Sequence, residues 1–402
     1  MHHKNKNESY YKLDNENKKM KLIQSQRHLF DIPNDIAYFN CAYNSPQLNE
    51  SKVRLLAGVT EKSHPWERTP KSFFENAEII RQLSADLFGG DSIGFAIIPA
   101  ASYGLSTAAR AIEPFIKKGE KILIMEEEFP SNVLPWKRVA NETGAIISTV
   151  PYPTDGNWTQ AIIDKININT KVVAISSCHW TNGSFVDLVA VGKVCREYDC
   201  VFVIDATQTL GAMPFSIEEI QPDFLVSAGY KWLLCPYGFS LLYVSEQWRN
   251  ARPLEETWLA RDNAEDFTAL VKYSDNYMAG SRRFDVGEKC TSNILPGAIA
   301  AFEQIKDWGI PQIAETLSLI NKRIDSHLEE LGFLLPNDSL RCPHMFGALI
   351  PPHYKDNLVS ELKAENIYIS QRGNSIRFAP HLHINDNDID KLLETLTKLM
   401  KK

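Results

Sequence analysis

The sequence has few cysteines, and their spacing excludes two kinds of site. Seven cysteines are dispersed over 402 residues, without a Cys-x-x-Cys pair or a paired cluster of cysteine and histidine. Structural metal sites need closely spaced ligands, and domains held together by disulfides need many cysteines in an even number. We therefore expect no metal site and no disulfide framework. Free cysteines in this number also favour a reducing compartment, the cytoplasm.

Long apolar runs and basic patches are also missing. No apolar stretch is long enough to cross a membrane, and residues 1–21 are polar and lack the apolar centre of a signal peptide. The net charge is −7, and the sequence contains no broad basic stripe. These features argue against a nucleic-acid surface and against an anionic membrane surface. We expect neither kind of partner.

A glycine-rich nucleotide loop is absent too. A nicotinamide oxidoreductase would carry a Gly-x-Gly-x-x-Gly turn after its first strand, and neither this motif nor a P-loop occurs. Hydrophobic residues make up 44% of the chain and charged residues 23%, which is ordinary for a soluble globular protein. The chain is long enough for two domains, each with its own core.

Buried strand-like runs alternate with amphipathic helical segments from about residue 72 onward. Such alternation predicts an α/β domain with a mainly parallel sheet, followed by a smaller α+β domain. The predicted strands are 95–98, 121–125, 146–150, 172–176, 201–204, 224–226 and 240–244, then 345–350, 367–370 and 375–378. The predicted helices are 73–88, 107–116, 188–198, 295–308, 311–331, 355–365 and 386–401. The predicted organisation is a polar N-terminal lead (1–30), a large domain (31–285) and a small C-terminal domain (286–402).

Asp205 and Lys231 are the most informative pair of residues. Asp205 ends one apolar run, and Lys231 follows the next one after a small-residue turn. Sites in open α/β sheets lie at the carboxyl ends of the strands, so the two side chains can share one pocket. A lysine that forms a Schiff base and an acid that pairs with a pyridinium nitrogen are what pyridoxal phosphate (PLP) requires. Taken alone, Asp205 fits equally well as a helix cap or a structural ion pair.

Three further segments are weaker candidates by themselves. Residues 99–107 form a small-residue turn before a helix, where Ala101 and Ser102 offer N–H groups to a phosphate or simply cap the helix. Phe129 follows another predicted strand and either stacks on a flat cofactor or packs in the core. Arg372 and Arg377 lie near the C-terminus, and Arg377 has apolar neighbours. That setting fits a carboxylate clamp and a structural salt bridge about equally.

Together these segments resemble the class V aminotransferase-like family of PLP enzymes, of fold type I. The family includes aminotransferases, cysteine desulfurases, kynureninases and isopenicillin-epimerase-like proteins. The resemblance runs from Tyr38 to His381. Its most specific part is Asp205-Ala-x-Gln208 followed by Ser227-x-x-Tyr230-Lys231-Trp-Leu. It implies a large domain with a seven-stranded sheet and a smaller C-terminal domain.

The resemblance also implies roles for individual residues. Lys231 would hold PLP and move the α-proton, while Asp205 would pair with the ring nitrogen. The other implied cofactor contacts are Ala101, Ser102, Ser227 and Tyr230 at the phosphate, Phe129 on the ring face, Gln208 at the ring oxygen, Asn182 facing the ring, and Asn293 reaching the phosphate of a neighbouring subunit. The implied substrate contacts are Arg377 at the α-carboxylate, Arg372 as second choice, and Asn44 at the entrance. Shared sites of this kind imply a homodimer.

Several reactions share this machinery. The sequence favours an aminotransferase acting on a small amino acid, with a kynureninase-like lyase or an amino-acid epimerase as alternatives. Desulfurases carry a nucleophilic cysteine between their two C-terminal basic segments. Here only Gly-Asn-Ser-Ile separates Arg372 from Arg377, and no cysteine follows Cys342. We therefore do not expect desulfurase activity. A cofactor-free binding protein on the same scaffold is a remote alternative.

Overall fold

The computed structural model describes residues 22–352, 354 and 357–401 of the 402-residue chain. Of the predicted polar lead, residues 1–21 lie outside the described residues. The described part of that lead packs against the C-terminal region. The Gln26 N–H donates to the Leu382 carbonyl at 2.7 Å, and Phe30 is buried. The predicted domain boundaries at residues 30 and 285 stay predictions.

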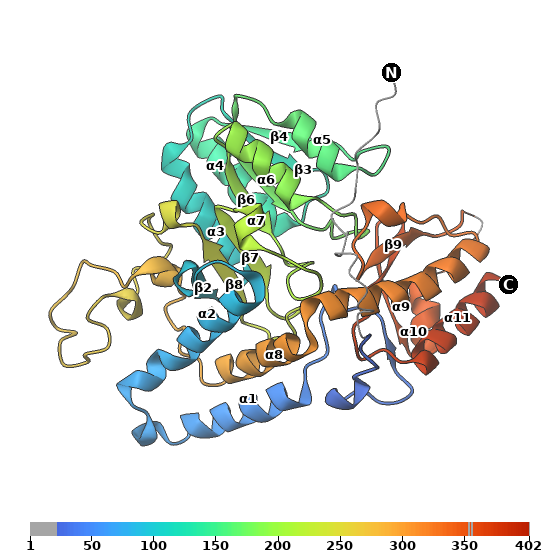
Figure 1. Ribbon diagram of the computed structural model, residues 1–402, viewed down its shortest axis with the longest axis horizontal. Coiled ribbons are helices and arrows are strands. Elements are labelled where there is room, and N and C mark those ends of the chain that lie inside the picture. The colour runs from blue at the N-terminus through green and yellow to red at the C-terminus, as the bar shows by residue number, and fades with distance from the viewer. Residues whose placement is uncertain (1–21, 353, 355–356, 402) are drawn as a thin grey trace, which may run out of the picture.

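A seven-stranded sheet forms the centre of the larger body (Figure 1). Its strand order is β2-β8-β7-β6-β5-β3-β4, and only β8 runs against its neighbours. The strands are β2 (Phe95–Ile98), β3 (Lys121–Met125), β4 (Ile146–Val150), β5 (Thr170–Ser176), β6 (Val201–Asp205), β7 (Phe224–Ala228) and β8 (Ser240–Val244). The predicted mainly parallel seven-stranded sheet is therefore confirmed. Four of its strands, β2, β6, β7 and β8, are buried over their whole length, as expected for a sheet covered on both faces.

Helices cover both faces of this sheet. Alternate side chains of the strands pack on α3 and α4 on one face, and on α2, α5, α6, α7 and α8 on the other. The helices are α1 (Asn49–Lys62), α2 (Glu75–Phe88), α3 (Ala101–Ile112), α4 (Leu134–Thr143), α5 (Trp158–Lys165), α6 (Leu188–Glu197), α7 (Ile217–Ile220) and α8 (Leu295–Trp308). The long helix α1 lies along α8, where the Ser51 hydroxyl donates to the Gly297 carbonyl at 2.9 Å.

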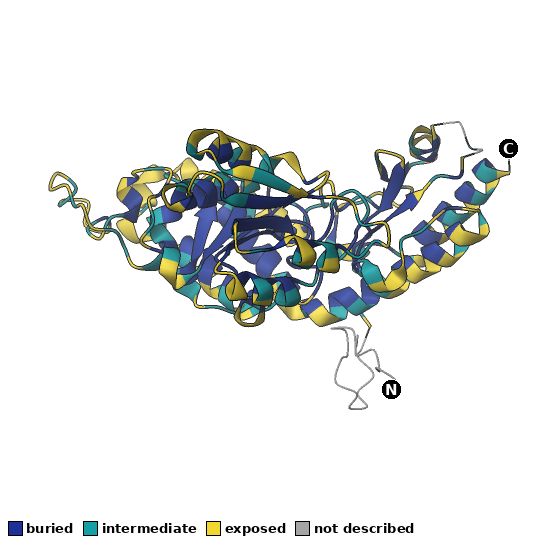
Figure 2. Ribbon diagram, turned by 90° about the horizontal axis from the view of Figure 1, so that it is seen from above, coloured by how far each residue is buried: buried dark blue, intermediate teal, exposed yellow. Residues whose placement is uncertain are grey.

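The smaller body holds a three-stranded antiparallel sheet of order β11-β12-β9 and a short parallel pair, β1 with β10. Its elements are β1 (Ala37–Tyr38), α9 (Ile310–Glu330), β9 (Phe346–Leu349), α10 (Leu358–Ala364), β10 (Ile367–Tyr368), β11 (Ser370–Arg372), β12 (Ser375–Phe378) and α11 (Asp386–Met400). A second apolar core joins these elements. Figure 2 shows the buried residues gathered in the strands and on the inner sides of the helices of both bodies.

Three of the predicted elements have clearly different bounds in the structure. The helix predicted from residue 107 begins at Ala101, because the small residues before it are already helical. The helix predicted from 355 begins at Leu358 among the described residues, and 355–356 lie outside them. The strand predicted over 367–370 is divided between β10 and β11, which belong to different sheets. No helix of the described residues is long and apolar enough to cross a membrane.

Candidate active site

Asp205 and Lys231 meet at the carboxyl edge of the central sheet. Asp205 ends β6 and is the register partner of Val226 on β7, and Lys231 follows β7 by three residues. Both side chains are buried. Burial lowers the pKa of Lys231 to about 8, although the charge of Asp205 opposes this shift. Burial raises the pKa of Asp205, and hydrogen bonds from Thr207 counteract the rise. The pair predicted from the sequence therefore interacts electrostatically.

Two aromatic rings flank the Lys231 amine. Its Nζ lies 5.6 Å from the ring centre of Phe129 and 5.8 Å from that of Tyr230. Tyr230 in turn packs on Tyr237, with ring centres 4.6 Å apart. Phe129 lies in the loop after β3, whose carboxyl end is on the same edge of the sheet. A flat cofactor joined to Lys231 would thus have an aromatic face beside it.

Gln208 is held by the protein itself. Its Nε2 donates to the Ala42 carbonyl at 3.1 Å, and its Oε1 accepts from the Trp232 indole N–H at 2.9 Å. The side chain is buried and lines the same pocket as Lys231. The amide is therefore oriented before any ligand binds. Its predicted contact with the ring oxygen stays a prediction.

The predicted phosphate contacts lie at the start of α3. Ala101 and Ser102 are its first residues, and no side chain caps the helix, so N–H groups of its first turn are available to an anion. Gly104 brings the helix close to β7, because a Cβ at this position would lie 2.9 Å from the Val226 side chain. β7 also carries the buried Ser227. The structure therefore brings these three predicted residues to neighbouring elements.

Arg372 and Arg377 come from one hairpin of the smaller body. Arg377 is 1% exposed, and its Nη1 donates to the Trp180 carbonyl at 2.6 Å. Its Nε and Nη2 are buried without a hydrogen-bond partner among the described residues. Burial and the nearby charge of Arg372 lower the pKa of Arg377 to about 9. The structural salt bridge that was the alternative interpretation of Arg377 is absent among the described residues.

A pocket of about 250 Å³ joins these groups. The residues that line it and that the sequence predicted are Asn44, Phe129, Gln208, Tyr230, Lys231, Arg372 and Arg377. The residues that line it without having been predicted are Ala42, Tyr43, Trp180 and Tyr237. The predicted residues outside this lining are Ala101, Ser102, Asp205, Asn182, Ser227 and Asn293. Seven predicted residues from both bodies therefore converge on one pocket.

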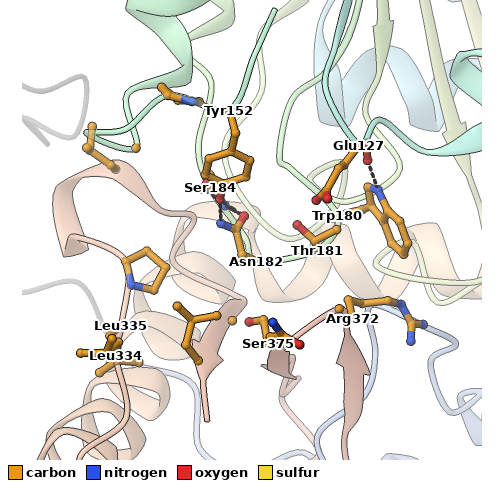
Figure 3. A pocket seen from close by; sticks show the side chains of 18 of the residues that line it. Glu127, Tyr152, Trp180, Thr181, Asn182, Ser184, Leu334, Leu335, Arg372 and Ser375 are labelled. Atoms are coloured by element: carbon orange, nitrogen blue, oxygen red, sulfur yellow. Dashed lines mark hydrogen bonds between the residues drawn. The ribbon is translucent and has the colours of Figure 1, made fainter. Parts of the chain in front are cut away.

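Trp180 lines the Lys231 pocket, whereas Asn182 does not. The Trp180 ring lies 5.4 Å from that of Phe129, and its indole N–H donates to the Glu127 carbonyl at 2.7 Å. Asn182 instead bonds Tyr152 and Ser184. It lines a cleft of about 860 Å³ between the two bodies, which shares Trp180 and Arg372 with the Lys231 pocket (Figure 3). The ring-facing role of Asn182 stays a prediction.

Asn293 lies away from the pocket of its own chain. It is exposed just before α8, beside α1, where a Cβ at Gly58 would collide with the Ser292 carbonyl. A contact with the cofactor would have to be made in another subunit. That role stays a prediction.

Glu128 is a buried carboxyl that the sequence reasoning missed. Its Oε1 accepts from the Phe129 N–H at 2.8 Å, and its Oε2 accepts from the Ser176 N–H at 2.9 Å. Burial, together with the nearby charge of Asp205, raises its pKa to about 7. Glu128 thus ties the loop of Phe129 to the end of β5. In the sequence it is the last of three consecutive glutamates, a pattern typical of solvent-exposed loops.

One known family matches most of this chain. The model of the family "Aminotransferase class-V" matches residues 63–385. The chain belongs to the class V aminotransferase family. A probable cysteine desulfurase of Pyrococcus abyssi is 22% identical, over 95% of this chain and 98% of the relative. An uncharacterized aminotransferase of Schizosaccharomyces pombe is 24% identical, over 94% of this chain and 96% of the relative.

Solved structures show the same fold. The apo cysteine desulfurase of Thermococcus onnurineus NA1 superposes with a TM-score of 0.81 at 19% identity, covering 95% of this chain and 100% of that one. A mutant of C-DES with glycine covalently linked to the PLP cofactor superposes with a TM-score of 0.82 at 17% identity, covering 92% and 98%. The chain is thus a class V enzyme of fold type I, and its cofactor is PLP. The frequent name cysteine desulfurase among relatives runs against our expectation from the sequence.

Proposed function

We propose that this class V enzyme transfers the amino group of an α-amino acid whose carboxylate binds Arg377. The observation that carries the proposal is the buried guanidinium of Arg377, whose Nε and Nη2 lack partners while the residue lines the pocket of Lys231. A buried charge without an acceptor is costly, and a planar carboxylate matches the guanidinium fork. An amino acid bound there would place its Cα near the lysine.

The residues present fit the cofactor. Lys231 would hold it covalently, Asp205 would face its ring nitrogen, Phe129 would cover one ring face, and the first turn of α3 would bind its phosphate. When bound, PLP supplies an electron sink that weakens the bonds at the substrate Cα. The hydrogen bond from the Thr207 N–H to Asp205 Oδ1, 2.9 Å long, keeps that carboxylate oriented.

Lys231 is suited to move the proton. With a pKa near 8, a useful fraction of its amine is unprotonated at neutral pH, so Nζ can accept a proton from Cα and deliver it again. Arg377 fixes the carboxylate and thereby selects which bond at Cα faces the lysine. The rings of Phe129 and Trp180 pack edge to face beside the lysine.

Removal of sulfur from cysteine is the second candidate, because several relatives carry the name cysteine desulfurase. The desulfurases described above use a thiol beside the substrate. No cysteine lines the pocket of Lys231; Cys290 is half-buried, and the other six cysteines of the chain are buried. This geometry favours amino transfer. A lyase or an epimerase remains compatible with the same groups.

The deciding experiment follows the products of the PLP-loaded enzyme. The visible spectrum is recorded with a pool of L-amino acids, first without and then with a 2-oxo acid. Amino transfer predicts that the cofactor band bleaches and that the 2-oxo acid restores it. Formation of alanine from cysteine would replace the proposal by desulfuration, release of sulfide with pyruvate and ammonia would replace it by a lyase reaction, and racemised substrate would replace it by epimerisation.

We also propose that the functional unit is a homodimer. Val53, Leu56 and Val59 are exposed at a spacing of three along α1, and α1 lies beside the loop of Asn293. An exposed apolar stripe of this kind is typical of a protein interface. Sedimentation analysis of the wild type and of Leu56→Glu tests this. The proposal fails if the wild type is a monomer at micromolar concentration.

A further inference from the structure

The charges around the Lys231 pocket are unbalanced. Three cationic side chains line it, Lys231, Arg372 and Arg377, and no acidic side chain does. Asp205 lies outside the lining, but its charge acts on Lys231. The α-carboxylate of a substrate would form an ion pair with Arg377. Arg372 is then the one lining cation without an anion to match it.

Arg372 has no structural counter-ion. Its Nη1 donates to the adjacent Gln371 carbonyl at 2.7 Å, and no carboxylate of the described residues forms an ion pair with it. The guanidinium lies over the Trp180 ring, 5.6 Å from its centre. In Figure 3, the Arg372 side chain extends toward the Trp180 side of the cleft and away from Asn182. The indole holds the cation at the border of the pocket but leaves its N–H fork free for a ligand.

The hairpin sets the distance between the two arginines. Arg377 is the register partner of Ser370, and Arg372 is two residues further along the same strand, β11. Side chains two residues apart on a strand share a face, so both arginines project from the same face of the hairpin. The backbones of diagonal neighbours of this kind lie about 7–8 Å apart. Two cationic side chains that start from neighbouring positions on one face can bind the two carboxylates of a short diacid.

We infer that Arg372 binds a second carboxylate on the substrate, so that the enzyme acts on α-amino dicarboxylic acids and their 2-oxo acids. The inference rests on the proposed function, since it takes Arg377 as the site of the α-carboxylate. Arg377 binds the α-carboxylate, which all amino acids share. Arg372, at the next position on the same face of the hairpin, binds the carboxylate at the end of the substrate side chain.

The test measures binding of unreactive acids to the PLP-loaded enzyme by calorimetry. Succinate and butyrate have four carbons each and differ in the second carboxylate. The wild type is expected to bind succinate at least about tenfold more tightly, as one charge-assisted hydrogen-bonded pair allows. Arg372→Gln should abolish this preference and leave butyrate binding unchanged. Arg377→Gln should weaken both acids.

A control variant separates a local contact from general electrostatics. Arg138→Gln removes the same charge from an exposed position on α4 and should leave both affinities unchanged. The inference is overturned if the wild type does not prefer succinate, or if the preference survives in Arg372→Gln. Unchanged binding of both acids in Arg377→Gln would instead overturn the proposed carboxylate site itself. If Arg372→Gln loses the preference but the enzyme proves not to transfer amino groups, the binding site for a second carboxylate stands and the proposed reaction falls.

Discussion

The two walls around Lys231 act on its charge in opposite directions. On the wall formed by β6 and β7, Asp205 raises the pKa of the lysine. On the wall formed by the β11–β12 hairpin, Arg377 and Arg372 lower it. The charge of the first wall has matching partners, because Asp205 accepts a hydrogen bond from the Thr207 N–H and interacts with the Lys231 cation. The second wall leaves two guanidinium nitrogens of Arg377 buried and without partners.

This difference separates the two tasks of the pocket. The matched wall is complete without substrate and can hold a resident cofactor. Under the proposed function, the unmatched wall is completed by the carboxylate of the substrate. Unpaired buried charge is destabilising, so its retention at one wall points to a ligand rather than to folding. Each prediction below removes one charge from one of the walls or from the lysine between them.

The largest expected effect comes from the lysine itself. Lys231→Ala removes the only amine that lines the pocket and should abolish covalent cofactor binding and turnover. Mass spectrometry after borohydride reduction should find PLP attached to the wild type but not to the variant. Lys193→Ala, at an exposed position on α6, serves as the control and should retain the cofactor. Full activity in Lys231→Ala would refute the assignment.

The next largest effect is expected from a substitution on the matched wall. Asp205→Asn keeps the volume and an acceptor for the Thr207 N–H but removes the charge that faces the cofactor nitrogen. We expect turnover to fall by about 10²–10³-fold, the usual loss for one preorganised electrostatic contact. Steady-state kinetics and thermal unfolding measure this together. A loss below tenfold would mean that Asp205 is a structural residue.

A substitution on the unmatched wall should lower activity less than the two substitutions above. It should also leave the thermal stability unchanged or raise it. Arg377→Gln should lower kcat/KM for amino acids by about 100-fold, mainly through KM, because a buried pair with the carboxylate is lost. Its Tm should stay the same or rise, because an uncompensated buried charge has been removed. A lower Tm with unchanged kinetics would show that Arg377 serves the fold instead.

Sequence reasoning located both walls because each depends on local patterns. Asp205 and Lys231 follow buried runs, and adjacent parallel strands bring such positions to one edge. Arg372 and Arg377 are separated by four residues, which a tight hairpin closes. The antiparallel direction of β8 and the helices α1, α4 and α5 were not predicted. Their placement depends on packing against α8 and the sheet, which no short pattern encodes.

The loops that join the walls could not be predicted. Glu127 adopts a positive φ of 53°, so the backbone turns there and only Glu128 of the three glutamates is buried. Gly183, with φ of 78°, turns the loop after β5, and Trp180 rather than Asn182 lines the pocket. Such turns depend on tertiary contacts, here with Met345 of the smaller body. The sequence alone therefore could not show which residues of this loop line the pocket.

The smallest expected effect is also the most direct test of the opposed walls. In the cofactor-free enzyme, the unprotonated Lys231 amine attacks PLP, so the rate of PLP uptake should rise with pH through a midpoint near 8 rather than the ordinary 10.5. Asp205 favours the protonated lysine, so Asp205→Asn should move the midpoint below that of the wild type. Arg377 disfavours it, so Arg377→Gln should move the midpoint above. Stopped-flow absorbance between pH 6 and 10 measures all three. If both variants shift the midpoint in the same direction, the walls do not oppose each other and the division between cofactor wall and substrate wall is wrong.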